Sequence, residues 1–357
     1  MLLLTTGVDW HGPLLIVGAS RSGSVMLHSI LNNSRRINLA GETHYFDDLR
    51  PRVNGKRLHD MSEAKRNFCL DYFRSLDVRP YGMAGDPNQS SLSRHELLKE
   101  ASNLGGGVDC LFQAYCQWRT REHGTIWGEK TPRHVFRINE ILDAFPAARI
   151  ICILRDPRGV VASYRDWTYQ GGLPTDGNPD YERAINQDHA RIGASYNIVI
   201  ASIMWRAAAN SAHAALQKHG SDRVRIVKYE HVIEDPMRVV AALFSWLGVD
   251  FSEEMLNIPI HNSATTPYLT SAGLKKSISM RWRTALNDQE IYIIQKVTQK
   301  AMKKFAYEPL SVKVDTLTLP KAYLTVPSAV IRAIGANRSR QNTLWDYILR
   351  RLKAALM

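Results

Sequence analysis

The amino-acid sequence predicts an α/β fold, a three-layer sandwich with helices on both faces of a central, mainly parallel sheet. Short apolar runs at residues 14–17, 150–154 and 224–227 are typical of strands that are buried on both faces. Segments with apolar residues at helical spacing lie between these runs. Strands that alternate with helices in this way favour a parallel sheet.

The first strand and helix form a unit near the N-terminus. The run at residues 14–17 stops at Gly18, and a Ser/Gly-rich turn leads into a helix that ends near Asn33. A second strand is expected just before Gly41. Helix-like stretches follow at residues 61–75, 94–103, 108–122 and 134–145.

A second strand–helix unit begins at residue 149. The turn Arg155-Asp156-Pro157 follows its strand, and Pro157 suits the first position of the next helix. Beyond it, the Gly/Pro/Asp-rich stretch 169–180 predicts a surface loop. A long Ala-rich helix is expected at residues 196–218, another strand at 224–227 and a helix that Gly248 ends at 236–247.

The chain divides into an expected domain over residues 1–310 and a basic extension over residues 311–357. The extension contains eight basic and two acidic residues. An apolar stripe predicts an amphipathic final helix, formed by Leu344, Tyr347, Ile348, Leu352 and Leu356. This helix could pack on the domain or make peripheral contact with a membrane.

Composition narrows the function classes. The 357 residues include 46 Lys and Arg against 34 Asp and Glu, a net charge of +12 that favours anionic partners. No apolar run approaches the roughly 20 residues of a membrane-spanning helix, so we expect no integral membrane protein. The four cysteines lack zinc-site or redox spacing and suit a reduced, cytoplasmic protein.

The loop GASRSGS at residues 18–24 follows a strand and opens a helix, a geometry that binds anions through backbone N–H groups. It matches the nucleotide-triphosphatase loop G-x-x-x-x-G-K-[ST] at both glycines. It differs at Ser24 and Val25, where that loop has its lysine and its magnesium-binding hydroxyl. The positive charge lies instead on Arg21. The loop therefore favours a phosphate-containing ligand used without metal, and a glycine turn in a non-catalytic protein is the alternative.

A second anion site is predicted at the end of the next strand. Arg155 ends that strand, and Ser163 lies eight residues later, about two helical turns away. The guanidinium and the hydroxyl could hold one further phosphate. An ion pair of Arg155 with Asp156 is the alternative. Two strand-end anion sites in one sheet indicate a ligand with phosphates at both ends.

These residues resemble the sulfotransferases that use 3′-phosphoadenosine 5′-phosphosulfate (PAPS). Residues 20–24 are similar to the family's 5′-phosphosulfate loop, and residues 154–163 to its 3′-phosphate motif. Further matches occur in order at Gly41-Glu42-Thr43, Gly128-Glu129-Lys130-Thr131-Pro132, Trp205-Arg206, Tyr229-Glu230-His231-Val232 and Arg281-Trp282-Arg283. The resemblance covers about residues 13–310, is nearer to the carbohydrate and tyrosylprotein branch, and implies a P-loop NTPase-like fold.

The resemblance implies four residues for the chemistry. Glu42 is the expected general base, with His44 as the alternative. Lys130 and Arg21 are expected to stabilise the sulfuryl group and the bridging oxygen of the leaving nucleotide.

The resemblance also implies the donor contacts. Arg21, Ser22, Gly23 and Ser24 are expected at the 5′ end, and Val25 replaces a hydroxyl residue that is usual in the family. The remaining expected contacts are Arg155 and Ser163 at the 3′-phosphate, Tyr229 near the base or in the core, and Arg281 as a second 3′-phosphate contact. Lys275, Lys276 and Ser277 share this last basic segment, and any of them could make that contact instead.

The sequence therefore predicts a metal-independent sulfotransferase that uses PAPS and an acceptor hydroxyl on a carbohydrate or glycolipid. A small alcohol, a phenol or a peptidyl tyrosine is an alternative acceptor. A basic nucleotide- or nucleic-acid-binding protein without catalysis is the alternative function. Against nucleic acid, the sequence has no zinc-finger spacing and no aromatic RNA-binding motif.

Overall fold

The structure is a computed structural model that describes residues 10–53, 56–78, 85–121, 124–166, 179–258, 274, 279–314 and 319–337. The expected final helix at 344–356 lies outside these residues. The proposed boundary between residues 310 and 311 stays a prediction.

A parallel four-stranded sheet forms the centre of the molecule. Its strands are β1 (Leu14–Gly18), β2 (Gly128–Lys130), β3 (Arg149–Leu154) and β4 (Val224–Lys228). They lie in the order β2-β1-β3-β4, and every neighbouring pair is parallel. The predicted α/β class with a parallel sheet is confirmed.

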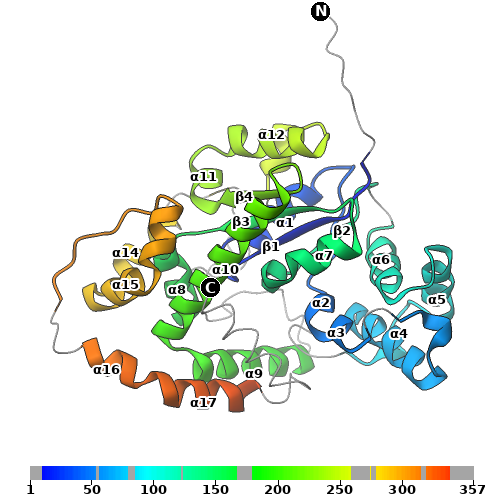
Figure 1. Cartoon of the computed structure of the whole chain (residues 1–357), viewed down its shortest axis with the longest axis horizontal. Helices are drawn as coiled ribbons and strands as arrows, with labels where there is room; N and C mark the ends of the chain where they lie inside the picture. Colours follow the sequence, from blue (N-terminus) through cyan, green and yellow to red (C-terminus); the bar gives the residue numbers. More distant parts are fainter. Residues whose placement is uncertain are drawn as a thin grey trace, which may run out of the picture.

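Side chains of the strands alternate between two apolar cores, as a sheet covered on both faces requires. Leu15, Val17 and Ile150 join one core, and Leu14 and Ile16 join the other. The first core is covered by α6 (Val108–Arg119), α7 (Ile138–Ala144) and α10 (Ile198–His219). The second is covered by α1 (Ser24–Asn32) and α12 (Pro236–Leu247). This arrangement is the predicted three-layer sandwich (Figure 1).

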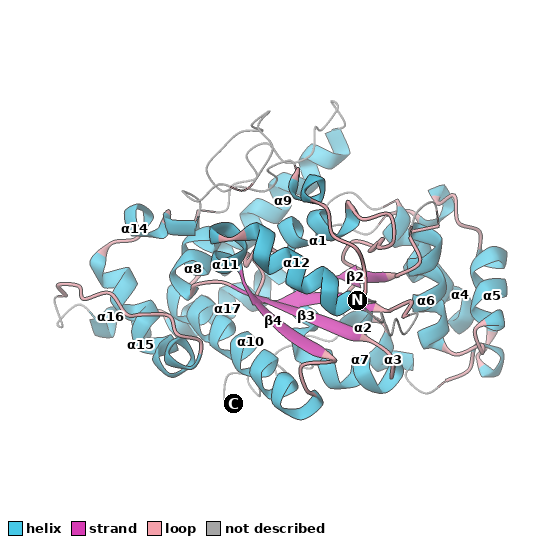
Figure 2. Cartoon of the chain, turned by 90° about the horizontal axis from the view of Figure 1, so that it is seen from above, coloured by secondary structure: helices cyan, strands magenta, loops and turns pink. Residues whose placement is uncertain are grey.

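Additional helices extend the sandwich on two sides. Beside β2 lie α4 (Glu63–Asp77), α5 (Arg94–Asn103) and α6, as Figure 2 shows. On the opposite side lie α14 (Trp282–Ala285), α15 (Asp288–Lys304) and α16 (Leu319–Leu324). Further α-helices in the described residues are α2 (Tyr45–Asp48), α3 (Arg50–Val53), α8 (Pro157–Arg165), α9 (Pro179–Ser195), α11 (Tyr229–Glu234) and α17 (Val326–Asn337).

Several helix limits differ from the prediction for local reasons. The stretch expected as one helix over 134–145 is a 3₁₀ helix, η3 (Pro132–Arg137), followed by α7. The long helix begins at Ile198 instead of residue 196, because the Asn197 side chain accepts hydrogen bonds from the first-turn N–H groups and caps it. Most of the expected loop at 169–180 lies outside the described residues, and α9 begins at Pro179.

The expected strand before Gly41 is wrong. Residues 37–40 make only isolated parallel bridges, Ile37 with Ile126 and Ala40 with Glu129. The regular edge strand is β2, whose sequence GEK has no apolar run although all three residues are buried. Residues 37–40 thus lie beside β2 and lead directly into the loop that carries Glu42.

No helix in the described part of the chain is long and apolar enough to cross a membrane.

Candidate active site

The loop at residues 18–24 is held tightly between β3 and α11. Gly18 has φ +149°, and a Cβ there would lie 2.2 Å from the carbonyl oxygen of Ile153. Gly23 has φ +93°, and a Cβ there would lie 2.4 Å from Cδ2 of Tyr229. Both positions therefore need glycine. The Tyr229 ring thus packs against the loop at Gly23. The sequence allowed two roles for Tyr229, a core residue or a ligand contact.

The interior of the loop contains a hydroxyl suited to a ligand. Ser22 is fully buried, and its Oγ has no hydrogen-bond partner among the described residues. Leaving a buried hydroxyl unpaired costs about 1–3 kcal/mol. Ser24 begins α1, and no side chain caps this nine-residue helix. The hydroxyl and the helix N-terminus together fit the phosphate end of a nucleotide.

The two predicted anion sites meet in space. Nε of Arg21 donates to Oγ of Ser163 at 3.1 Å, and Nη1 of Arg155 donates to the carbonyl of Arg21 at 3.3 Å. The Arg155 guanidinium also lies 4.5 Å from the centre of the Tyr229 ring. The phosphate loop, the end of β3 and α8 thus bring two guanidinium groups and a hydroxyl into one cluster.

Asp156 forms an ion pair with Arg158, whereas the sequence analysis gave a pair with Arg155 as the alternative. Asp156 binds Arg158, with Nη2 and Oδ2 2.6 Å apart, and Arg158 packs over the Trp282 ring. Glu230, which the sequence analysis did not single out, accepts from the Asp156 N–H at 2.9 Å. Burial raises the pKa of Glu230. These contacts fix the turn into α8, on which Ser163 lies.

The predicted catalytic residues form a second cluster at the end of β2. Nζ of Lys130 donates to Oε1 of Glu42 at 2.5 Å, and Nε2 of His44 lies 3.4 Å from Oε2 of Glu42. The Lys130 side chain is 9% exposed and the Glu42 side chain 34%. Lys130 lies beside Ile16 in the sheet register, two residues before the phosphate loop begins. The acid–base cluster and the anion loop therefore lie at the same edge of the sheet.

The family model for the sulfotransferase family matches residues 13–253. The chain belongs to the sulfotransferase family. Its relatives include carbohydrate sulfotransferase 2 of Mus musculus, 25% identical over 107 residues, which are 29% of this chain and 20% of the relative. Carbohydrate sulfotransferase 5 of Mus musculus is 25% identical over 170 residues, 44% of this chain and 41% of the relative. The chain thus spans between a fifth and two fifths of these relatives' length.

A solved structure supports the fold of this sulfotransferase-family chain. The sulfotransferase domain from the curacin biosynthetic pathway aligns with a TM-score of 0.50 and 16% identity. The alignment covers 84% of this chain and 99% of that domain. At this identity the likeness concerns the arrangement of helices and strands.

Sequence reasoning about this chain missed Glu129, a buried acid on β2 that precedes Lys130. Its carboxylate accepts from the Oγ1 atoms of Thr43 and Thr131 and lies 2.6 Å from Nδ1 of His134. Burial alone would raise the pKa of Glu129, but the charge and hydrogen bond of His134, with the two hydroxyls, hold it below its usual value. The only sequence signal was its place beside Lys130 in the GEKTP run.

His28 was also missed, because only the tertiary structure brings it near Lys130. Burial, with a further effect of the Lys130 charge, lowers the pKa of His28 from 6.5 to about 4. Its Nε2 lies 2.9 Å from the carbonyl oxygen of Leu39. His28 is therefore neutral at neutral pH and adds no charge to the cluster of Lys130 and Glu42.

Arg281 and Val25 are the last two residues that the sequence analysis assigned to the donor site. Nη1 of Arg281 pairs with Asp166 at 2.9 Å, three residues beyond Ser163. Its 3′-phosphate contact stays a prediction, and Lys275, Lys276 and Ser277 lie outside the described residues. Val25 is half-buried on α1 and supplies no hydroxyl to the loop.

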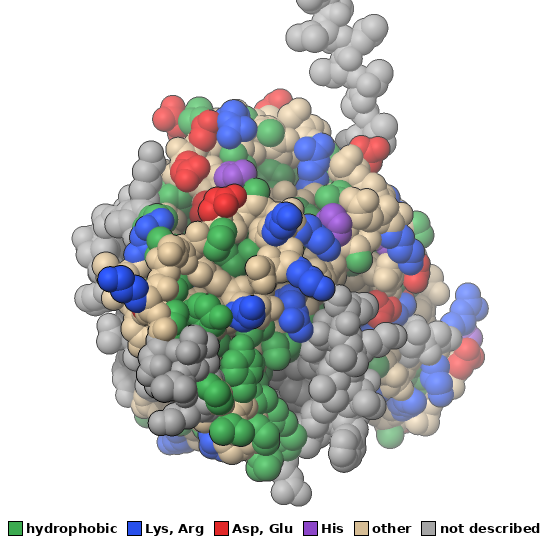
Figure 3. Space-filling view, turned by 60° about the vertical axis from the view of Figure 1, so that its left-hand side comes forward, with side chains coloured by type: hydrophobic (Ala, Val, Ile, Leu, Met, Phe, Trp, Pro, Cys, Tyr) green, Lys and Arg blue, Asp and Glu red, His purple; other side chains and the backbone are tan. Residues whose placement is uncertain are grey.

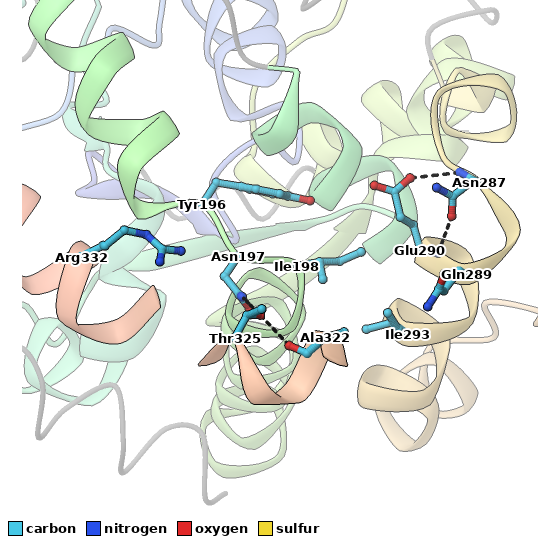
Figure 4. A pocket seen from close by; sticks show the side chains of 10 residues that line it. All are labelled: Tyr196, Asn197, Ile198, Asn287, Gln289, Glu290, Ile293, Ala322, Thr325 and Arg332. Carbon is cyan, nitrogen blue, oxygen red and sulfur yellow. Dashed lines mark hydrogen bonds between the residues drawn. The ribbon is translucent and has the colours of Figure 1, made fainter. Parts of the chain in front are cut away.

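A pocket of about 370 Å³ lies apart from these clusters, between the start of α10 and α15 and the C-terminal helices α16 and α17 (Figure 4). Tyr196 extends across it toward Glu290, whose carboxylate binds Arg165 at 2.8 Å. The pocket contains none of the predicted donor or acid–base residues. Among the described residues, no group of three or more His, Cys, Asp or Glu side chains could hold a metal ion.

Proposed function

We propose that this protein transfers the sulfuryl group of PAPS to an acceptor hydroxyl. The observation that carries the proposal is the position of the Lys130–Glu42 pair beside a phosphate loop whose buried Ser22 hydroxyl has no hydrogen-bond partner in the described part of the chain. Family membership supports the same reaction class.

The donor would be held at both of its phosphate-bearing ends. Ser22, Gly23 and Ser24 would bind the 5′ end, with Arg21 beside them. Arg155 and Ser163 would bind the 3′-phosphate. The hydrogen bond from Arg21 to Ser163 at 3.1 Å supports a single nucleotide site. It joins the groups proposed for the 5′ end of PAPS to those proposed for its 3′-phosphate.

The proposed reaction needs a base and a positive charge. The acceptor oxygen forms a bond to sulfur, the bond from sulfur to the 5′-phosphate oxygen breaks, and Glu42 receives the acceptor proton. Lys130 stabilises the negative charge that grows on the leaving oxygen. Nζ of Lys130 contacts Glu42 at 2.5 Å, so a phosphosulfate group would compete with Glu42 for the lysine, and a lysine drawn to that group would leave Glu42 available to the acceptor. His44, at 3.4 Å from Glu42, is the alternative base.

We propose a carbohydrate or glycolipid as acceptor, supported by the names of the two relatives above. Incubation with radiolabelled PAPS, EDTA and a panel of glycans, glycolipids, phenols and tyrosyl peptides tests this. Label transferred to a glycan supports the proposal, and transfer only to a phenol or peptide contradicts the acceptor class. Absence of transfer to every acceptor, together with salt-sensitive nucleic-acid binding, would favour the alternative function.

Location is also a proposal. The described cysteines are all unpaired thiols, and Cys69, Cys116 and Cys152 are buried, which supports a reducing, cytoplasmic setting. Peripheral membrane contact by the C-terminal extension is supported by exposed apolar side chains. Leu324 and Ile331 are 76% and 70% exposed, on α16 and α17. Figure 3 shows apolar side chains gathered low on the face that carries these C-terminal helices. Sedimentation with anionic and with neutral vesicles tests this contact.

A further inference from the structure

Glu42 and Lys130 belong to two different segments of the chain. Glu42 lies in the loop after residues 37–40, and Lys130 ends β2. The backbone N–H of Lys130 donates to the carbonyl of Ala40 at 3.1 Å. Among the described residues, no backbone–backbone hydrogen bond joins residues 41–43 to β2 beyond that point, and the Tyr72 hydroxyl donates to the carbonyl of Thr43 at 2.6 Å. The 2.5 Å contact between Lys130 and Glu42 therefore depends on side-chain hydrogen bonds that hold the loop against β2 as support.

The carboxylate of Glu129 supplies that support. One oxygen, Oε2, accepts from the backbone N–H of Thr43 at 3.1 Å and from its hydroxyl at 2.6 Å. The same oxygen accepts from the Thr131 hydroxyl at 2.8 Å. The other oxygen, Oε1, lies 2.6 Å from Nδ1 of His134 on η3. One side chain thus joins the loop of Glu42, the end of β2 and η3.

Glu129 itself is not placed to react with a substrate. Its side chain is 0% exposed, whereas the Glu42 side chain is 34% exposed. Three hydrogen bonds, from the N–H and hydroxyl of Thr43 and from the hydroxyl of Thr131, converge on Oε2, and the His134 ring lies 2.6 Å from Oε1. Burying a carboxylate costs free energy unless the carboxylate is paired and hydrogen-bonded. Losing any one of these contacts would therefore destabilise the fold around Glu129.

We infer that Glu129 is a positioning residue that holds the general base and the lysine in register. Thr43 lies between Glu42 and His44 in the sequence, and Glu129 immediately precedes Lys130. Fixing Thr43 on Glu129 therefore fixes the distance from Glu42 to Lys130. The inference rests on the proposed function, in which these two residues carry the chemistry.

Two substitutions separate placement from charge. Glu129→Gln keeps the length of the side chain, and its carbonyl oxygen can still accept from Thr43 and Thr131. Glu129→Asp withdraws the carboxylate by about 1.5 Å, the length of one C–C bond. A misplacement of about 1 Å can reduce turnover about 100-fold. We expect Glu129→Asp to lower kcat by about that factor with unchanged KM for PAPS, and Glu129→Gln to recover most of the loss.

Hydrogen–deuterium exchange of the peptide that contains Thr43 gives a readout that needs no turnover. The Thr43 amide donates to Glu129 and Thr131, so it should exchange slowly in the wild type and in Glu129→Gln, and faster in Glu129→Asp. Val240→Ala, in the core on the opposite face of the sheet, is the control for lost stability and should change neither kcat nor this exchange.

Equal exchange and equal kcat in Glu129→Asp and the wild type would overturn the inference. Equal impairment of the Gln and Asp variants would also overturn it, since charge and not placement would then matter. A wild type that transfers no sulfuryl group would refute the proposed function, while the exchange of Thr43 would still test the positioning.

Discussion

Replacing Arg155 with alanine should weaken binding of the desulfated product, 3′-phosphoadenosine 5′-phosphate (PAP). Arg155 directly follows β3, and its side chain donates to the Arg21 carbonyl at 3.3 Å and lies 4.5 Å from the centre of the Tyr229 ring. It is 9% exposed, so water cannot readily replace it at the phosphate. A hydrogen bond to a charged group contributes about 1.5–3 kcal/mol, which corresponds to about 10- to 150-fold in Kd.

Calorimetric titration of PAP into the wild type and Arg155→Ala measures this change. Arg238→Ala is a matched control, because it removes the same charge from a 72% exposed side chain on α12. We expect the control to bind PAP as the wild type does. Equal affinity in Arg155→Ala and the wild type would refute the 3′-phosphate site, and an equal loss in both variants would indicate an effect of net charge.

Three further results are expected. Glu42→Gln should abolish turnover and leave PAP affinity unchanged, and an active variant would exclude Glu42 as the base. Gly23→Ala should destabilise the fold by about 1–3 kcal/mol in urea unfolding, because its Cβ would overlap the Tyr229 ring, whereas Gly193→Ala, whose Cβ meets nothing within 4 Å, should not. The folded pKa of His28, about 4, lies below its ordinary 6.5, so the folded state disfavours protonation and His28 reduces stability as the pH falls from 6.5 toward 4. By pH 4.5 this loss reaches about 2–3 kcal/mol, and His28→Gln should unfold with a correspondingly weaker pH dependence. An unchanged pH dependence would contradict the neutral, buried state of His28.

The sequence was sufficient for the parts of the fold that depend on local pattern. The strands β1, β3 and β4 are apolar runs bounded by turns, and they were predicted correctly. Two anion sites at strand ends of one sheet were predicted, because the ends of neighbouring parallel strands lie at one edge; the contact of Arg21 with Ser163 emerged only in the structure.

The remaining parts depend on tertiary contacts that no local pattern encodes. The strand β2 consists of Gly128, Glu129 and Lys130, which look like an exposed turn until the structure buries them. The buried Glu129 is stabilised there by Thr131 and His134 and by Thr43, which lies 86 positions earlier in the chain and donates to it. His28 likewise loses its charge through burial beside Leu39 and near the Lys130 charge, and neither contact is local in the sequence.

Calorimetric titration of the wild-type protein with PAP, in the presence and in the absence of EDTA, tests the central claim most directly. A nucleotide site made of Ser22, Arg21, Arg155 and Ser163 predicts binding of one PAP per chain with the same affinity under both conditions. Absence of binding, or binding that EDTA abolishes, would contradict a metal-independent PAPS site.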